Sequence, residues 1–565
     1  MAAITAKHHH LQRWGDLKKE RSSWIGHWSE LSQHLQPRLG RFFVTDRNRG
    51  GKRHNAIYDS TGTRALRVLA AGMMAGMTSP ARPWFRLTTA DPELAEHHNA
   101  RLWLSDVRRL MLDVYQRSNT YRTFQGLYEE LGCFGTGASL ALPDFATVQH
   151  HYPATIGEYA IATDYKGKVN TYYREMEKTV AELVEEFGRD KCSRTVKNLY
   201  DRNQLDVWVP VIHAIEPRTS RDPSRRDALN MPFSSCYFET GANPGEYLRE
   251  SGFRDFRVLA PRWHATGGDI YGYSPGMEAL GDIKQLQHEQ LRKAQAIDYQ
   301  TKPPIALPAA EKGTEPDLLP GGVTYINASV PHQGARTLFE TRLDLSYLLQ
   351  DIQDVRGRVN SAFYADLFLM LAQAPSDGRM TATEVAERHE EKLLMLGPVL
   401  ERLHNELLDP LIKLTFADLV EAGAVPPPPP ELEQQSIRVE FVSMLAQAQR
   451  AVGTASTDRF VANLGQVASF KPDVLDKFDS DKWVDTYADN LGVDPELIVA
   501  DSKVALIREQ RAAAQAQAEQ AALAKETADA AQKGAAAAAS ASEAGVLDNI
   551  LNLYSGYGSP SAEAY

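Results

Sequence analysis

The first candidate for chemistry is a Gly-x-Ser-x-Gly sequence, Gly272-Tyr273-Ser274-Pro275-Gly276. This pattern is typical of a nucleophile elbow, which uses the backbone N–H after its serine as part of an oxyanion hole. Here that position is Pro275, which has no N–H. Proline suits the first turn of a helix, so we interpret Ser274-Pro275 as the start of a helix and not as an acyl-transfer site.

Motifs for metal or nucleotide chemistry are also incomplete. The pairs His288-Glu289 and His389-Glu390 both lack the second histidine of a His-Glu-x-x-His zinc site. The three cysteines are too widely spaced for a metal site or a disulfide framework, and they indicate a reducing compartment. We therefore expect no catalytic residue, no bound metal and no cofactor.

The most basic stretch of the chain is a glycine-containing segment that follows the first predicted helix. Its cationic residues are Arg38, Arg41, Arg47, Arg49, Lys52 and Arg53. It is not a Walker A loop, because arginine follows Gly51-Lys52 and the upstream glycine spacing is missing. Two interpretations stay open: a solvated loop, or a contact with a phosphate backbone or an acidic partner.

Composition narrows the class of protein. The chain has 565 residues, enough for roughly three to four domains' worth of sequence and a sizeable core. Its net charge of −11 disfavours non-specific adhesion to nucleic acid by the molecule as a whole. The start carries His8-His9-His10 where a secretory signal would have an apolar segment, and the longest apolar run, residues 68–77, is too short to cross a bilayer. We expect no membrane partner.

Two long amphipathic helices organise the chain and must position any functional side chain. The first begins after Ser274-Pro275, and Pro303-Pro304 stop it because consecutive prolines remove donors and disfavour helical neighbours. Apolar residues at three- and four-residue steps predict the second over about residues 343–369. The insert between them contains two short strand-like segments. Such a hairpin cannot bury both apolar faces alone, so it needs neighbours from the same chain or from other copies.

The flanking regions mix both kinds of secondary structure. Upstream, we predict a helix over residues 11–36 with a core-forming aromatic stripe, a hairpin over 158–177 and a short helix over 179–187. Downstream, a helix over about 381–419 should kink at Pro398 and Pro410. Residues 501–544 are Ala-rich and form either a long helix or a mobile tail. The predicted fold class is α+β, predominantly helical.

Several segments together carry a family resemblance. They are "YDSTGTRALRVLAAGMMAGMTSPARPWFRL", "LGCFGTGASLAL", "YKGKVNTYYREMEKTVAELVEEFG", "APRWHATGGDIYGYSPGMEALGDIKQLQ" and "RMTATEVAERHEEKLLMLGPVLERLHNELLDPLI". In order and spacing, over about residues 14–493, the chain resembles the head-to-tail connector, or portal, proteins of short-tailed bacteriophages. None of these segments is a catalytic fingerprint.

The resemblance implies a portal-type subunit with a wing, a stem helix pair, a small β clip and a C-terminal helical crown. It divides the chain into a mixed α+β wing region (1–270), stem helix 1 (271–302), clip (303–340), stem helix 2 (341–369), tunnel loop (370–380), kinked wing helix (381–424), C-terminal wing or crown (425–500) and Ala-rich crown or mobile tail (501–565).

The resemblance also suggests three groups of contact residues. The candidates that face DNA in the tunnel loop are Gln373, Ser376 and Arg379. The candidates for basic channel rings, or equally for intersubunit salt bridges, are Lys284, Arg292 and Lys293. The candidates for clip contacts to the motor or the adaptor are Glu311, Lys312, Glu315 and Asp317.

The function implied by the resemblance is a homo-oligomeric ring, usually a dodecamer, at one capsid vertex of the virion, assembled in the host cytoplasm. The implied partners are double-stranded viral DNA, the terminase large subunit, a tail adaptor, and the major capsid and scaffolding proteins. Packaging force would come from a separate ATPase, which agrees with the missing nucleotide motif, so we expect no enzyme. The alternatives are another ring-forming virion protein, such as an adaptor or internal ejection protein, and a nucleic-acid-processing enzyme.

Overall fold

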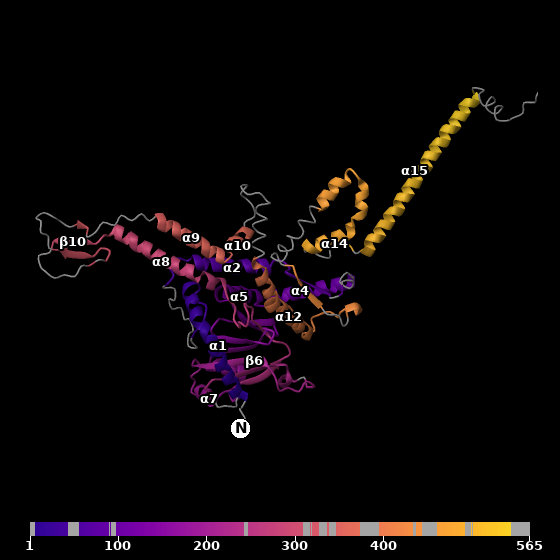
Figure 1. Ribbon diagram of the computed structural model, residues 1–565. Coiled ribbons are helices and arrows are strands. Elements are labelled where there is room, and N and C mark those ends of the chain that lie inside the picture. Colours follow the sequence, from indigo (N-terminus) through magenta and orange to yellow (C-terminus); the bar gives the residue numbers. More distant parts are fainter. Residues whose placement is uncertain are drawn as a thin grey trace, which may run out of the picture. The chain divides into compact units, whose positions relative to one another are not determined.

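The computed structural model describes residues 6–42, 56–89, 91, 98–225, 227–241, 247–308, 317, 319–326, 336–337, 346–372, 395–432, 437–442, 460–491, 499 and 501–543. The chain divides into two units, residues 1–492 and 493–565, and each is described by itself. The predicted mixture of helix and sheet is confirmed, with more helix than strand (Figure 1).

The main helices are α1 (Ala6–His34), α2 (Thr61–Met77), α4 (His98–Arg117), α5 (Thr120–Phe134), α6 (Val180–Phe187), α7 (Arg194–Asp201), α8 (Pro275–Thr301), α9 (Ser346–Ala362), α10 (Ala365–Ala372), α12 (Asp409–Glu421), α14 (Ser480–Leu491) and α15 (Asp501–Glu543). The strands are β1 (Phe85–Thr89), β2 (Ala138–Asp144), β3 (Val148–Ala154), β4 (Tyr159–Thr163), β5 (Val169–Thr179), β6 (Trp208–Pro217), β7 (Phe233–Glu239), β8 (Arg249–Phe253), β9 (Val258–Leu259), β10 (Ile305–Pro308), β11 (Val323–Ile326), β12 (Arg336–Thr337) and β13 (Ile437–Phe441).

An antiparallel five-stranded sheet, ordered β4-β5-β6-β7-β8, dominates the N-terminal region. The predicted hairpin over residues 158–177 is its β4–β5 pair, which turns at Gly167 with a φ of +76°. The short helix predicted after it is α6, which starts with a capping box between Thr179 and Glu182 and ends at Gly188. Further sheets have the orders β3-β2-β9 and β1-β13.

The largest apolar core joins the helices α1, α2, α5, α8, α9 and α12. The aromatic stripe on α1 is core, as predicted: Trp14 and Trp28 are buried, and Trp24 packs against the same core as Trp28. Glycine permits the closest approach between helices here. A Cβ on Gly72 of α2 would lie 2.1 Å from the Phe368 ring of α10, so α10 can dock on α2 only because that position has no side chain.

The prediction of one continuous helix over about residues 343–369 is wrong. The segment forms two helices, α9 and α10, separated at Phe363 and Tyr364. Tyr364 has a φ of 54°, in the left-handed region that breaks a helix. The break redirects the chain so that Leu367 and Phe368 become buried with the core that contains α2. The first residues of the prediction, 343–345, lie outside the described residues.

The kink predicted at Pro410 takes the form of a π-helical turn, His404–Leu408. The N–H of Asp409 bonds to the carbonyl oxygen of His404, five residues back. Proline lacks an N–H and its ring collides with the carbonyl four residues earlier, so widening the preceding turn accommodates it. Residues 395–403, around Pro398, are helical, and residues 381–394 lie outside the described residues.

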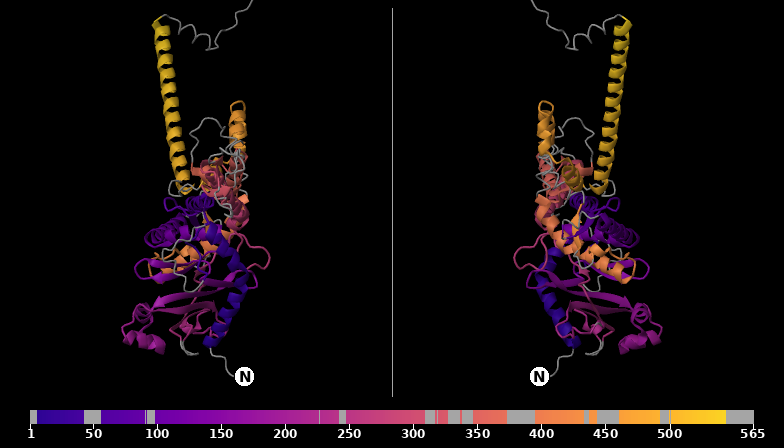
Figure 2. Two further views of the ribbon diagram at one scale, coloured as in Figure 1. Left: turned by 90° about the vertical axis from the view of Figure 1, so that its left-hand side faces the viewer. Right: turned by 90° about the vertical axis from the view of Figure 1, so that its right-hand side faces the viewer.

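The insert between α8 and α9 contains a three-stranded sheet, in the order β11-β10-β12. The two predicted strands are β10 and β11, which pair in parallel, while the two-residue β12 was not predicted. In the second unit, α15 is one continuous helix (Figure 2). Among the residues that the structure describes, no helix is both long enough and apolar enough to span a bilayer.

Candidate functional site

Helices α8 and α9 lie side by side, with β10 beyond the C-terminal end of α8 (Figure 1). They are antiparallel, because Asp282 near the start of α8 pairs with Arg358 near the end of α9 at 3.0 Å. The predicted start of α8 is confirmed: the Ser274 hydroxyl accepts from the Met277 N–H at 3.0 Å, and Pro275 lies in the first turn. The hydroxyl also donates to the Cys133 carbonyl, and Ser274 is buried, so it is a helix cap and not a nucleophile.

The half of this pair nearer the core, residues 275–289 of α8 and 352–362 of α9, is here called the inner half. Its apolar side chains join the main core; they are Leu280, Ile283, Leu286, Ile352, Val355 and Val359. Burying such side chains contributes about 1.5–3 kcal/mol each, so the inner half is fixed within one chain.

Asp59, just before α2, joins three helices at the inner half. Its Oδ1 accepts from the Thr61 N–H at 2.8 Å, and its Oδ2 accepts from Arg356 of α9 at 2.7 and 3.1 Å. Gln287 of α8 forms two hydrogen bonds with the backbone of Asp59. Its Oε1 accepts from the Asp59 N–H, and its side-chain amide donates to the Asp59 carbonyl. Burial raises the pKa of Asp59, but the hydrogen bonds from Thr61 and Arg356 outweigh it and leave that pKa lowered.

The outer half of the pair, residues 290–301 of α8 and 346–351 of α9, is different. The last buried residue of α8 is Glu289 and the first of α9 is Ile352. Large apolar side chains are exposed instead: Ile297, Tyr347 and Leu349 are 40, 78 and 42% exposed. The outer half therefore presents apolar surface that one chain does not cover.

Glu289 and Asp351 lie at the border between the two halves. Burial raises the pKa of Glu289, and the hydrogen bond and like charge of Asp351 raise it further. Glu289 therefore binds a proton more readily than an isolated glutamate would. The contact between Glu289 and Asp351 is therefore sensitive to pH, and it lies where the inner half meets the outer half.

The predicted basic residues of α8 do not form one group. Lys284 donates to Glu30 of α1 at 2.5 Å, and this hydrogen bond lowers the pKa of Glu30. Arg292 is exposed and contacts His288 and Gln295 of its own helix, at 3.5 and 3.4 Å. Lys293 is half-buried in the outer half.

The other predicted contact residues are only partly described. Arg41 of the basic segment faces acids: it lies 3.2 Å from Glu158 and 3.7 Å from Glu177, while Arg38 is exposed. In the segment predicted to be a clip, Asp317 is exposed and caps a local turn by accepting from the Leu319 N–H at 3.0 Å. The remaining predicted contact residues lie outside the described residues; they are Arg47, Arg49, Lys52, Arg53, Glu311, Lys312, Glu315, Gln373, Ser376 and Arg379.

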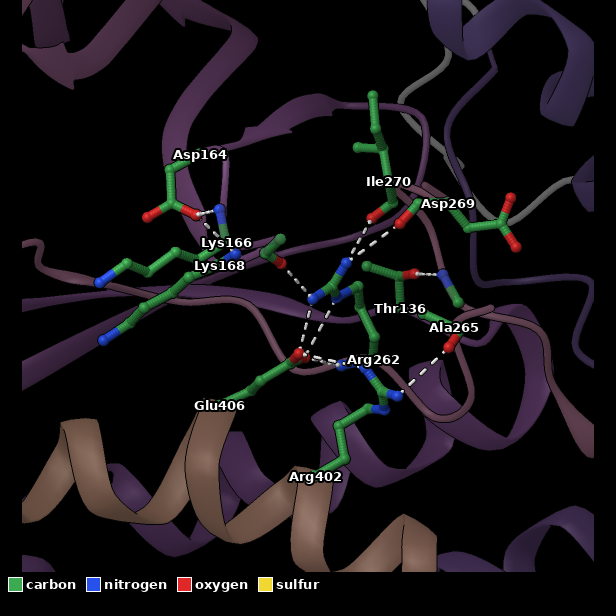
Figure 3. A network of polar contacts seen from close by, with 12 residues as sticks. Thr136, Asp164, Lys166, Lys168, Arg262, Ala265, Asp269, Ile270, Arg402 and Glu406 are labelled. Carbon is green, nitrogen blue, oxygen red and sulfur yellow. Dashed lines mark hydrogen bonds and ion pairs between the residues drawn. The ribbon is translucent and has the colours of Figure 1, made fainter. Parts of the chain in front are cut away.

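Sequence reasoning missed the polar network that holds the segment before α8 (Figure 3). Glu406, on the π-helical turn, accepts from the Arg262 guanidinium at 2.6 and 3.2 Å and from the Arg262 backbone N–H at 3.0 Å. Arg262 also donates to the carbonyls of Asp269 and Gly167, at 3.1 and 2.8 Å. Arg402 donates to the Ala265 carbonyl at 3.2 Å. The kink expected at Pro410 was the available signal, because Glu406 lies on the π-helical turn just before that proline.

Comparisons with known proteins indicate the family to which the chain belongs. The family described as "Bacteriophage head to tail connecting protein" matches residues 7–499. The chain is 62% identical to a "Probable portal protein" of Bordetella phage BPP-1 over 557 residues, which cover 99% of this chain and 100% of that protein. It is 44% identical to a "Portal protein" of Salmonella phage epsilon15 over 520 residues, which cover 92% of this chain and 93% of that one.

Solved structures resemble the chain only loosely. A chain from "Neck of empty GTA particle computed with C6 symmetry" has a TM-score of 0.35 and 13% identity, covering 79% of this chain and 95% of that one. A chain from "Neck of native GTA particle computed with C12 symmetry" has a TM-score of 0.33 and 14% identity, covering 76 and 91%. Likeness at this level carries no weight in the assignment.

The family match and the two relatives together span nearly the whole chain. They confirm the resemblance seen in the sequence, and with it the prediction of a phage portal protein. The chain belongs to the bacteriophage head-to-tail connecting protein family.

Proposed function

We propose that this chain forms a closed ring at one vertex of the capsid, and that double-stranded viral DNA passes through this ring during packaging and ejection. The observation that carries the proposal is the near-full-length similarity to two phage portal proteins. The same similarity argues against an adaptor or internal ejection protein, because the relatives match over at least 93% of their own length.

Within this ring, α8 and α9 act as the stem and the β10–β12 sheet as part of the clip. The anchored inner half and the exposed apolar outer half support this assignment. In the assembled ring, the outer halves of neighbouring copies pack against one another and bury Ile297, Tyr347 and Leu349. The wing comprises the mixed N-terminal region with α12, and α15 belongs to the crown.

The charge of the chain suits a conduit that lets DNA slide. A net charge of −11 opposes tight binding to phosphates, which would slow translocation. We assign transient DNA contacts to Gln373, Ser376 and Arg379 of the tunnel loop, and to Arg292 or Lys293 of the stem. Lys284 is assigned to anchoring, because its ammonium already contacts Glu30.

The partners follow from the same assignment. The clip, including Asp317, receives the terminase large subunit during packaging and a tail adaptor afterwards, while the wing meets the major capsid and scaffolding proteins. Assembly takes place in the host cytoplasm. The ring itself is not an enzyme, and force comes from the separate motor.

Electron microscopy of the purified protein, with and without its scaffold, tests the proposal. End-on class averages should contain closed rings whose central hole admits duplex DNA, roughly 20 Å across or more. The number of subunits is read from the same averages, with a dodecamer expected. Compact monomers under both conditions, together with measurable nucleotide hydrolysis, would contradict the proposal and favour a nucleic-acid-processing enzyme.

A further inference from the structure

Two histidines and a glutamate gather at the start of α1, within the proposed wing. His9 and His10 lie in the first turns of α1, and Glu216 lies near the end of β6. One ligand atom from each residue lies within 4.8 Å of the other two. Imidazole nitrogens and carboxylate oxygens are ligands that Zn²⁺ and similar divalent metals prefer.

The spacing of these atoms suits a tetrahedral ion. The Nδ1 atoms of His10 and His9 lie 3.2 and 3.6 Å from the same Glu216 oxygen, Oε1. Two ligands bound at about 2.0–2.1 Å in tetrahedral geometry are separated by roughly 3.3–3.4 Å. The side chain of His9 is 63% exposed, so it is free to turn and bring its nitrogen to the same distance from His10.

The other two ligands are held in place by their neighbours. The His10 ring stacks on Phe238 and meets Tyr247 edge-on, with ring centroids 6.0 and 5.9 Å apart. The Tyr173 hydroxyl donates to Glu216 Oε2 at 2.9 Å, the oxygen that the histidines do not approach. A hydrogen bond to the free oxygen of a ligating carboxylate is a common way to orient metal ligands.

One existing contact of His10 would change on metal binding. The His10 Nδ1 lies 2.8 Å from the Tyr173 hydroxyl, and a bound metal would replace this contact. Coordination therefore requires His10 to carry its proton on Nε2.

We propose that His9, His10 and Glu216 bind one divalent transition metal ion, such as Zn²⁺, in each chain, with water as the fourth ligand. The ion ties the first turns of α1 to β6. It thereby fixes the beginning of the chain on the five-stranded sheet, which is a structural role independent of DNA passage.

The test measures Zn²⁺ affinity by competition with a chromophoric chelator, in the full-length protein freed of metal. The variants are His9→Ala and Glu216→Gln, and the matched control is His8→Ala, which removes an exposed histidine outside the cluster. We expect one Zn²⁺ per chain, at least a tenfold loss of affinity in each of the two variants, and no change in the control. Zn²⁺ should also raise the melting temperature of the wild-type protein but not that of Glu216→Gln.

Glutamine is isosteric with glutamate and can still accept from Tyr173, so Glu216→Gln should fold; its circular dichroism checks this. If Glu216→Gln binds Zn²⁺ as tightly as the wild type, or if His8→Ala loses as much affinity as His9→Ala, the run of histidines chelates metal without Glu216 and the proposal is wrong. Failure of the wild type to bind stoichiometric Zn²⁺ would overturn it too.

Discussion

The inner and outer halves of the α8–α9 pair have similar helical structure but different surroundings. The inner half contributes fully buried side chains to the main core and is fastened to α1 and α2 by Lys284, Gln287 and Arg356. The outer half has no buried side chain and exposes Ile297, Tyr347 and Leu349. The difference teaches that one chain specifies the fold of the inner half, whereas we propose that other copies of the chain cover the outer half.

The largest expected effect on the stability of the single chain is in the inner half. Ile283→Ala removes a fully buried side chain that contacts the helix-packing surface at Gly62. We expect a loss of about 2–5 kcal/mol in the free energy of unfolding, because the cavity cannot collapse between packed helices. Denaturant unfolding of the unassembled chain measures it. A loss below about 1 kcal/mol would mean that the inner half is not packed as described.

A smaller effect is expected when the Asp59 cluster is broken. Arg356→Ala leaves the buried Asp59 carboxylate without its cationic partner, so we expect a loss of about 1–3 kcal/mol. Arg358→Ala is the matched control, since Arg358 is 47% exposed and its pair with Asp282 should be worth less than about 1 kcal/mol. Thermal unfolding compares the stability of the two variants. Equal losses of stability would show that Asp59 does not hold the helices together.

The border between the halves should respond to pH. Folding raises the pKa of Glu289, so the folded chain keeps the proton of this residue at pH values where the unfolded chain has released it. The contribution of Glu289 to stability is therefore lost progressively as the pH rises above about 4.3, the ordinary pKa of glutamate. Glu289→Gln can donate to Asp351 at any pH. We expect the variant to be more stable than the wild type at pH 7–8, by less than about 1 kcal/mol, and the advantage to vanish in acid. A constant stability difference between the two proteins across the pH range would contradict the raised pKa of Glu289.

Substitutions in the outer half should have the smallest effect on the stability of the single chain. Their effect on ring assembly should be large. Replacing Ile297, Tyr347 and Leu349 together by serine should change the unfolding free energy of the monomer by less than about 0.5 kcal/mol per site, since all three are exposed. Ring formation, measured by size-exclusion chromatography with light scattering, should fall sharply. Gln350→Ser, at an exposed polar position in the same half, is the control for substitution by serine. If the triple variant forms rings as the wild type does, the outer half does not mediate contacts between copies.

Local chemistry made part of this structure predictable from sequence. Ser274-Pro275 marked the start of α8, because capping involves residues within one turn. The helix α6 was predicted over residues 179–187, and its capping box between Thr179 and Glu182 is equally local. The break at Tyr364 was missed because apolar periodicity continues through Leu367 and Phe368. After the break, the Phe368 ring packs against Gly72 of α2, a tertiary contact that the periodicity of one helix does not encode.

The contacts that position the α8–α9 pair could not be found in the same way. Asp59 meets Arg356 across 297 positions, and Arg262 meets Glu406 across 144. Ion pairs at such separations leave no periodic signal in one sequence, because each partner reads as an ordinary surface charge until the fold brings the two together. Lys284 illustrates this: the resemblance made it a candidate for a basic channel ring or an intersubunit salt bridge, and the structure pairs it with Glu30 of the same chain.

Hydrogen exchange read by mass spectrometry, on the unassembled chain and on the ring, tests the central claim most directly. In the unassembled chain, amides of residues 275–289 and 352–362 should exchange slowly, and those of 290–301 and 346–351 quickly. Ring formation should slow exchange in the outer half and leave the inner half almost unchanged. Equal protection of both halves in the unassembled chain, or an outer half that stays unprotected in the ring, would contradict the account.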